Sequence, residues 1–135
     1  MKITLCGSIK FFDKMVDIQK ILEASGHSVF MPIQVPGVNY WDEDGSGRMQ
    51  AKIELNLAKT HFDKIKNSDA ILVANYTKGD IENYIGASTF LEMAFAHYMD
   101  KKIFILNALP NQKYIDDELR SYQGTIIDGD LSKVM

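Results

Sequence analysis

The sequence predicts an α/β protein in which a parallel sheet lies between two layers of helices. Strand-like stretches alternate along the chain with stretches that repeat apolar residues every three to four positions, the spacing of a helix face. The stretch from Ala70 to Ala74 is apolar without interruption, as expected for a strand covered on both faces. With 135 residues, the chain is expected to form one domain spanning residues 1–135.

Two strands and two helices make up the first half of the predicted domain. Gly26 ends the first helix, as a glycine placed just after the last helical residue. The elements expected here are a strand from Lys2 to Cys6, a helix from Phe11 to Ala24, a strand from Val29 to Ile33 and a helix from Met49 to Lys66. The segment from Val35 to Arg48 carries a proline and several glycines, and is therefore predicted to be a loop.

Three more strands and two helices complete the predicted domain. Ser88 or Thr89 provides a hydroxyl to cap the longer helix, which runs to about Met99. The other elements expected here are strands at Ala70–Ala74, Lys102–Leu106 and Thr125–Ile127, and a short helix from Tyr114 to Ser121. Because strands joined through helices form parallel sheets with right-handed crossovers, we expect a flavodoxin/Rossmann-like three-layer sandwich of about five strands. For the strand order we choose the flavodoxin-like 2-1-3-4-5, which the sequence alone does not fix.

The composition excludes several classes of protein and partner. The net charge is −3 and no run of basic residues stands out, which argues against a nucleic-acid-binding surface. A single cysteine leaves no disulfide framework and indicates a reducing, cytoplasmic location. No apolar run approaches the roughly 20 residues of a membrane-spanning helix, so no membrane contact is expected. The thin C-terminal edge of the sheet suggests cover by a second subunit, in a homodimer or a larger homo-oligomer.

The turn from Cys6 to Lys10 is the first feature that could bind a ligand. It follows a strand and opens a predicted helix, where main-chain N–H groups attract anions such as phosphate. It matches neither the dinucleotide-binding glycine motif nor the nucleotide-binding P-loop. An equally good interpretation is that Gly7 only makes a tight turn, and that Cys6 is a small apolar residue of the core.

Glu92 is the strongest candidate for chemistry. In one interpretation, Thr89 and Glu92 form a capping box, in which the glutamate reaches back to the N–H at the helix start. In the other, the carboxylate lies in the first helical turn, is held ionised by the helix dipole and is surrounded by apolar neighbours. A buried, ionised carboxylate can attack the anomeric carbon of a sugar and form a glycosyl ester.

Four further residues lie where the predicted elements would meet a ligand. Asp69 starts the third strand, where it could also cap the turn out of the preceding helix, and it lies away from the usual active edge. Asn75, at the other end of that strand, could hydrogen-bond a sugar or base. Gly86 permits the close approach of a ligand, and Ser88 offers a hydroxyl that caps the helix or binds phosphate.

The sequence shows no convincing metal site. The acidic stretch from Asp42 to Gly47 resembles a calcium loop but lacks its twelfth-position glutamate. The loop that contains it is better explained as a mobile lid carrying Tyr40 and Trp41. The three histidines, His27, His61 and His97, have no zinc-type spacing with one another or with Cys6, and each is expected on a helix surface or at a helix end.

Three segments together resemble a known family. They are CGSI after the first strand, SDAILVANY around the third, and YIGASTFLEMAFAHYMDKKIF leading into the fourth. From about Lys2 to Leu106 the chain resembles the nucleoside 2-deoxyribosyltransferase superfamily, which includes the deoxyribonucleoside 5′-monophosphate N-glycosidases. The resemblance implies a domain of that kind over residues 1–135.

The resemblance also implies roles for individual residues. Glu92 matches the family glutamate that attacks C1′ of the deoxyribose and holds the sugar as an ester. Asp69 matches a family aspartate at the start of the equivalent strand, which is implicated in the site. Gly7, Ser8 and Ile9 match the loop that lines the sugar and phosphate side of the site.

These observations favour an enzyme that cleaves the N-glycosidic bond of 2′-deoxynucleosides or their 5′-monophosphates through a glutamyl-deoxyribosyl intermediate. The sugar would pass to a nucleobase or to water, and no metal or redox cofactor is expected. Lys10 and the helix after Gly7 favour a nucleotide over a nucleoside. The alternative is a non-catalytic nucleotide-binding module, because Thr4 and Gly86 depart from the family pattern.

Overall fold

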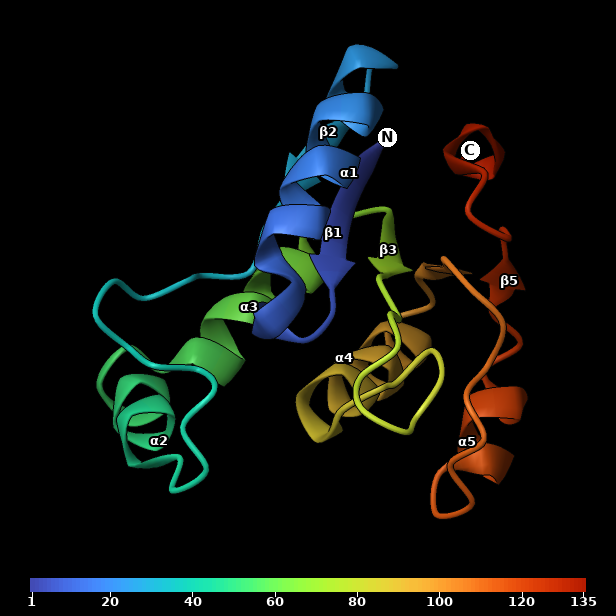
Figure 1. Ribbon diagram of the computed structural model, residues 1–135. Coiled ribbons are helices and arrows are strands. Elements are labelled where there is room, and N and C mark those ends of the chain that lie inside the picture. The colour runs from blue at the N-terminus through green and yellow to red at the C-terminus, as the bar shows by residue number, and fades with distance from the viewer.

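The computed structural model describes residues 1–135 and contains one parallel sheet (Figure 1). Its strand order is β2-β1-β3-β4-β5, and every neighbouring pair is parallel. The strands are β1 (Lys2–Cys6), β2 (Ser28–Phe30), β3 (Ala70–Val73), β4 (Lys102–Ile105) and β5 (Thr125–Ile126). The predicted fold class and the predicted strand order are both confirmed.

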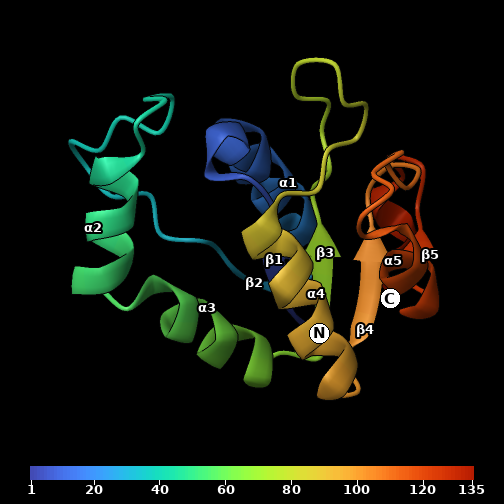
Figure 2. The same ribbon diagram turned by 90° about the horizontal axis from the view of Figure 1, so that it is seen from below.

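Helices cover both faces of the sheet, which gives the three layers seen in Figure 2. One face carries α1, and the other carries α3 and α4, with α5 at the far edge and α2 standing off to one side. The helices are α1 (Phe12–Ala24), α2 (Ser46–Glu54), α3 (Leu57–Lys66), α4 (Ala87–Tyr98) and α5 (Asp116–Ser121), with 3₁₀ turns η1 (Ile9–Phe11) and η2 (Leu131–Lys133). None of the helices has the length and apolar character that crossing a membrane would require.

The alternation of side chains along β1 decides which layer each residue meets. Ile3 and Leu5 belong to the buried cluster that includes α1, whereas Cys6 belongs to the cluster that includes α3 and α4. Thr4 is fully buried, and its hydroxyl lies 2.6 Å from the hydroxyl of Ser68, just after α3. The last residue of β1 therefore meets α3 and α4 at the carboxyl edge of the sheet.

The predicted helix from Met49 to Lys66 is wrong, because the structure divides it into α2 and α3. The break falls at Leu55 and Asn56, and Asn56 has φ +45° and ψ +52°. These are left-handed backbone angles, which asparagine adopts more readily than most residues because its short amide can hydrogen-bond locally. The apolar spacing continues across the break, so periodicity alone did not reveal it.

The break makes a stability prediction at Asn56. We expect Asn56→Ala to lower the free energy of unfolding by about 1 kcal/mol, because a Cβ without a polar group is strained at positive φ. Asn56→Gly is the matched control and should keep the wild-type value to within about 0.5 kcal/mol. Urea unfolding of the three proteins measures both effects, and equal stability of the alanine and glycine variants would contradict the strained turn.

Candidate functional site

Glu92 is placed by the buried face of α4. Thr89, Met93 and Ala96 are buried on this helix at spacings of four and three residues, and they pack toward the sheet. Glu92 follows Thr89 by three positions, so it lies beside this face and points inward. The side chain of Glu92 is 13% exposed. A carboxyl group is thus held within the apolar layer between α4 and β1.

The capping-box interpretation of Glu92 is wrong. The N-cap of α4 is Gly86, neither Ser88 nor Thr89, and no side chain caps this helix. Glu92 is the sixth residue of α4, in its second turn, so the favourable N-terminal dipole is weaker there than the sequence suggested. The carboxyl group is therefore free of the local backbone and available for a site.

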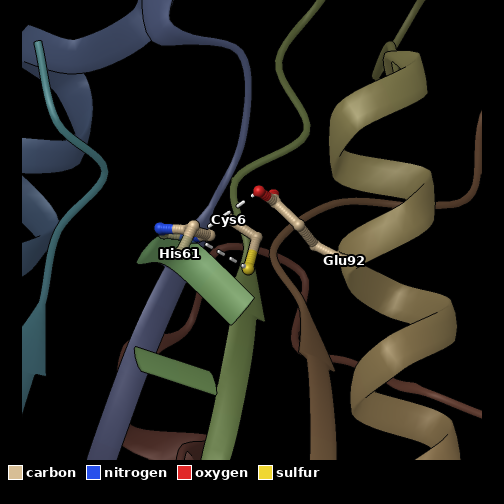
Figure 3. Close-up of side chains that lie close together, drawn as sticks. All are labelled: Cys6, His61 and Glu92. Atoms are coloured by element: carbon tan, nitrogen blue, oxygen red, sulfur yellow. Dashed lines mark hydrogen bonds and ion pairs between the residues drawn. The ribbon is translucent and has the colours of Figure 1, made fainter. Parts of the chain in front are cut away.

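Cys6, His61 and Glu92 converge from β1, α3 and α4 (Figure 3). The Nε2 atom of His61 lies 3.6 Å from Cys6 Sγ and 3.8 Å from Glu92 Oε2. One donor atom from each of the three residues lies within 4.8 Å of the others. The other ring nitrogen of His61, Nδ1, is buried without a hydrogen-bond partner. The main chain of Leu5 is nevertheless close enough to act on the His61 ring and to raise its pKa.

Burial controls the protonation of all three groups. It raises the pKa of Glu92 to about 8, although the Cys6 thiol and the Lys52 ammonium both act to lower it. Burial, together with the cation of Lys64, lowers the pKa of His61 to about 4. Burial also raises the pKa of the Cys6 thiol well above its usual value, and the Glu92 carboxylate adds to that effect. At neutral pH Glu92 is therefore mostly protonated in the free protein, and the expectation that the helix dipole holds its carboxylate ionised is wrong.

Glu92 and His61 form one wall of a cavity that we call the inner pocket, of about 160 Å³. The helices α3 and α4 pack against each other beside this cavity. Phe62 of α3 stacks on Phe95 of α4, with ring centroids 4.7 Å apart. Glu92 is the single acidic residue of the lining, which consists of Gly7, Pro32, Ile33, Lys52, Leu57, Ala58, Thr60, His61, Phe62, Lys64, Ser88, Leu91 and Glu92.

A second cavity of about 400 Å³, which we call the outer pocket, adjoins the first. The two share Gly7, Ile33, Lys52, Leu57 and Ser88. The outer pocket is lined by four cationic side chains and no acidic one; the cations are Lys10, Arg48, Lys52 and Lys78. In a protein with a net charge of −3, this concentration of positive charge indicates a site for an anion.

The cations of the outer pocket lie close enough to perturb one another. Burial and the neighbouring charges of Lys78 and Arg48 lower the pKa of Lys10. The ammonium group of Lys10 also lies 4.8 Å from the centre of the Trp41 ring, and that of Lys78 lies 4.7 Å from the centre of the Tyr84 ring. A bound anion would relieve the repulsion between these charges.

The structure brings Gly7, Ser8, Ile9 and Lys10 to the wall of the outer pocket. A Cβ on Gly7 would lie 3.0 Å from the carbonyl oxygen of Ala74, a tighter contact than is usual, so glycine suits a turn that passes this close to the end of β3. Between Gly7 and α1 lies the 3₁₀ turn η1, in which the hydroxyl of Ser8 accepts a hydrogen bond from Lys10 N. The anion-binding features of this pocket are thus side-chain cations more than the start of α1.

The structure does not bring Asp69 to either pocket. Its carboxylate accepts a hydrogen bond from Lys2 N at 2.7 Å, beside the first residue of β1. Cys6 lies at the opposite end of β1, roughly 13 Å away at the usual rise per strand residue. This position matches the interpretation of Asp69 as a residue that fixes the turn before β3.

Asn75 lies at the active edge of the sheet, but its side chain is fully engaged. Its Oδ1 accepts from Asn107 N at 2.9 Å, and its Nδ2 donates to the carbonyls of Asn107 and Ala108. Asn107 Nδ2 in turn donates to Asn75 O at 3.0 Å. The expectation that Asn75 hydrogen-bonds a sugar or base is therefore replaced by a structural role, in which it joins the ends of β3 and β4.

Gly86 and Ser88 lie in the outer pocket, at the start of α4. A Cβ on Gly86 would lie 3.0 Å from the hydroxyl of Tyr84, so the close approach predicted at this glycine is made by a tyrosine of the chain itself. The hydroxyl of Ser88 accepts a hydrogen bond from Lys52 Nζ at 3.2 Å, which connects α4 to α2.

Sequence reasoning missed His61 and three of the four cations. A signal for His61 was present, because it continues the apolar series Leu57, His61, Ile65 at four-residue spacing, and a histidine on an apolar helix face is informative. The expectation that His61 lies on a helix surface is wrong, since it is 6% exposed. Arg48, Lys52 and Lys78 come from three distant segments, and no local pattern marks them.

Comparison with known proteins finds solved structures of similar fold. One of them is the CMP N-glycosidase BcmB of Clostridium botulinum, with a TM-score of 0.54 and 17% sequence identity over 99% of this chain and 95% of that chain. No family model and no curated protein matches the sequence. This likeness agrees with the α/β fold and the parallel sheet that the sequence predicts.

The raised pKa of Glu92 makes a prediction about stability. Between pH 4.5 and about 8 the unfolded chain has lost the proton that the folded protein keeps, so stability falls as the pH rises through this window. Glu92→Gln cannot ionise. The free energy of unfolding of this variant minus that of the wild type should therefore be larger at pH 8.5 than at pH 5, by on the order of 3 kcal/mol.

Urea unfolding at both pH values measures this effect. Taking the difference between the two proteins cancels the opposite contribution of His61, whose lowered pKa makes stability rise between pH 4 and 6.5. Glu118→Gln, at an exposed position on α5, is the matched control and should follow the wild type. A difference between Glu92→Gln and wild type that does not change with pH would contradict the burial argument.

Proposed function

We propose that this protein cleaves the N-glycosidic bond of 2′-deoxynucleosides or their 5′-monophosphates, with Glu92 forming a glycosyl ester. The observation that carries the proposal is a single buried carboxyl group at the inner end of a cavity whose outer part holds four cations. The shared fold supports it, because BcmB acts as an N-glycosidase on a nucleotide, CMP.

The reaction uses the carboxyl group in its ionised form. As the bond between C1′ and the base nitrogen breaks, the base leaves with the bonding electrons and positive charge develops at C1′. Glu92 shares an electron pair with C1′, and the resulting ester holds the sugar while the base departs. Water or another nucleobase then attacks C1′ and releases the carboxylate.

The proton balance of this step fits the protonation of the site. Glu92 has a pKa of about 8, so at neutral pH it must lose a proton before it can attack. The departing base must gain one proton, so the two requirements offset each other within one turnover. The apolar surroundings that hinder ionisation of Glu92 also strengthen its attraction to the positive charge that develops at C1′.

The outer pocket favours a substrate with a 5′-phosphate. Lys10 and Lys78 place positive charge around a cavity large enough for a phosphate group, and Lys52 lies between the two pockets. The first N–H groups of α4, near Ser88, have no side-chain cap and face the same cavity wall. A nucleotide would thus place its sugar near Glu92 and its phosphate among the cations.

The first prediction for this function concerns Glu92 and base release. The wild-type protein, incubated with deoxynucleoside 5′-monophosphates and with CMP, should release free base that chromatography detects. Glu92→Gln should reduce kcat by on the order of 1,000-fold or more, because the nucleophile is lost. Glu118→Gln is the matched control and should keep wild-type activity.

The products decide between hydrolysis and transfer. Addition of free adenine should yield a new nucleotide if a base reaches the ester, and free sugar phosphate if water does. Intact-protein mass spectrometry of a rapidly quenched reaction should show the added mass of the sugar phosphate on the wild type and none on Glu92→Gln. Tight nucleotide binding with no product from any substrate would instead support the non-catalytic binding module.

A further prediction concerns the phosphate. Lys10→Met and Lys78→Met should each raise KM for a nucleotide by about 10-fold, which corresponds to about 1.4 kcal/mol of lost binding. Neither change should alter kcat/KM for the corresponding nucleoside, because a nucleoside carries no charge for these side chains to contact. Lys20→Met, at an exposed position on α1, serves as the control. Equal losses with nucleotide and nucleoside would contradict a phosphate site.

A further inference from the structure

The cluster of Cys6, His61 and Glu92 has a second chemical property that the glycosidase reaction does not use. We propose that Cys6 Sγ, His61 Nε2 and one Glu92 oxygen form a binding site for a zinc ion. The three side chains supply thiolate, imidazole and carboxylate, which are the ligand types that zinc takes in proteins. Thiolate and imidazole together favour zinc strongly over magnesium and calcium, which prefer oxygen ligands.

The spacing of the donor atoms fits tetrahedral coordination. With zinc–sulfur and zinc–nitrogen distances of about 2.3 and 2.05 Å, a tetrahedral angle separates the sulfur and nitrogen atoms by about 3.6 Å. Cys6 Sγ and His61 Nε2 lie 3.6 Å apart. Nitrogen and oxygen ligands should lie about 3.4 Å apart, and His61 Nε2 and Glu92 Oε2 lie 3.8 Å apart. The Cys6 sulfur and the Glu92 oxygen lie within 4.8 Å of each other, against about 3.6 Å for two tetrahedral ligands, so zinc binding requires the Glu92 side chain to turn toward the sulfur.

The surroundings of the cluster suit a metal ion with one open position. Cys6 is the fully buried member of the cluster, whereas His61 and Glu92 line the inner pocket. An ion would therefore enter from the pocket. The inner pocket, which His61 and Glu92 line, provides room for water or a ligand as a fourth partner of the ion. Binding releases the protons of the thiol and the carboxyl group, and two negative ligands with one Zn²⁺ give an uncharged complex. A neutral complex is favoured in an apolar interior.

A bound zinc ion would block the proposed nucleophile. The metal takes the electron pair with which Glu92 would attack C1′, so zinc is expected to inhibit base release. This consequence rests on the proposed function. The binding site itself rests only on the three donor atoms, and its test does not need the reaction.

Metal titration of the chelator-treated protein tests the site directly. Isothermal titration with Zn²⁺ should show one site per chain, and Co²⁺ should give the thiolate-to-cobalt charge-transfer band in the near ultraviolet. Cys6→Ser should abolish that band, and Glu92→Gln and His61→Gln should each weaken Zn²⁺ binding by at least about 10-fold. His97→Asn, on the exposed side of α4, is the matched control and should bind as the wild type does.

The outcomes separate this inference from the proposed function. A cobalt complex without a thiolate band, or Zn²⁺ affinity unchanged in Glu92→Gln, would overturn the metal site whatever the activity. Metal binding as described, in a protein that releases no base even after chelator has removed the metal, would uphold the site and contradict the glycosidase. If Cys6→Ser does not fold, as judged by circular dichroism, Glu92→Gln still decides the question, because it keeps the shape of the side chain.

Discussion

The cost of placing a carboxyl group in an apolar layer is the constraint on which the rest of this site depends. Glu92 lies between β1, α3 and α4, and its pKa of about 8 shows that the fold opposes its charge. No cation forms an ion pair with it; Lys52 acts only from a distance, and its ammonium group is hydrogen-bonded to Ser88. A carboxyl group in this position destabilises the fold once it is ionised. Its position is therefore better explained by a role in a reaction than by a contribution to stability.

The topology explains why this constraint falls at one end of the molecule. All five strands run in the same direction, so the segments that leave β1, β3 and β4 gather at a single edge. Gly7 lets the first of these segments pass close to Ala74, and the Asn75–Asn107 hydrogen bonds hold the ends of β3 and β4 together. The backbone at this edge is therefore fixed, and the inner pocket is built on rigid elements.

Much of the fold could be predicted because its signals are local. Alternating strand and helix patterns predicted the parallel sheet and its layers, and Gly7 and Glu92 stand out within short motifs. The strand order was a choice of the flavodoxin-like arrangement, which local patterns do not determine. What the sequence could not supply is long-range: Cys6 and His61 are 55 positions apart, and their contact depends on how α3 crosses the end of β1. Asp69 and Asn75 illustrate the converse, because residues suited to binding a ligand are instead occupied by hydrogen bonds to the main chain.

The buried thiol of Cys6 has one more consequence. It is the only cysteine of the chain, it is fully buried, and it lies directly behind the carboxyl group of the site. A thiol-reactive dye can therefore react with the Cys6 thiol only when α3 and α4 separate from β1. The labelling rate of the unaltered protein therefore measures how often this part of the structure opens, and no engineered cysteine is needed.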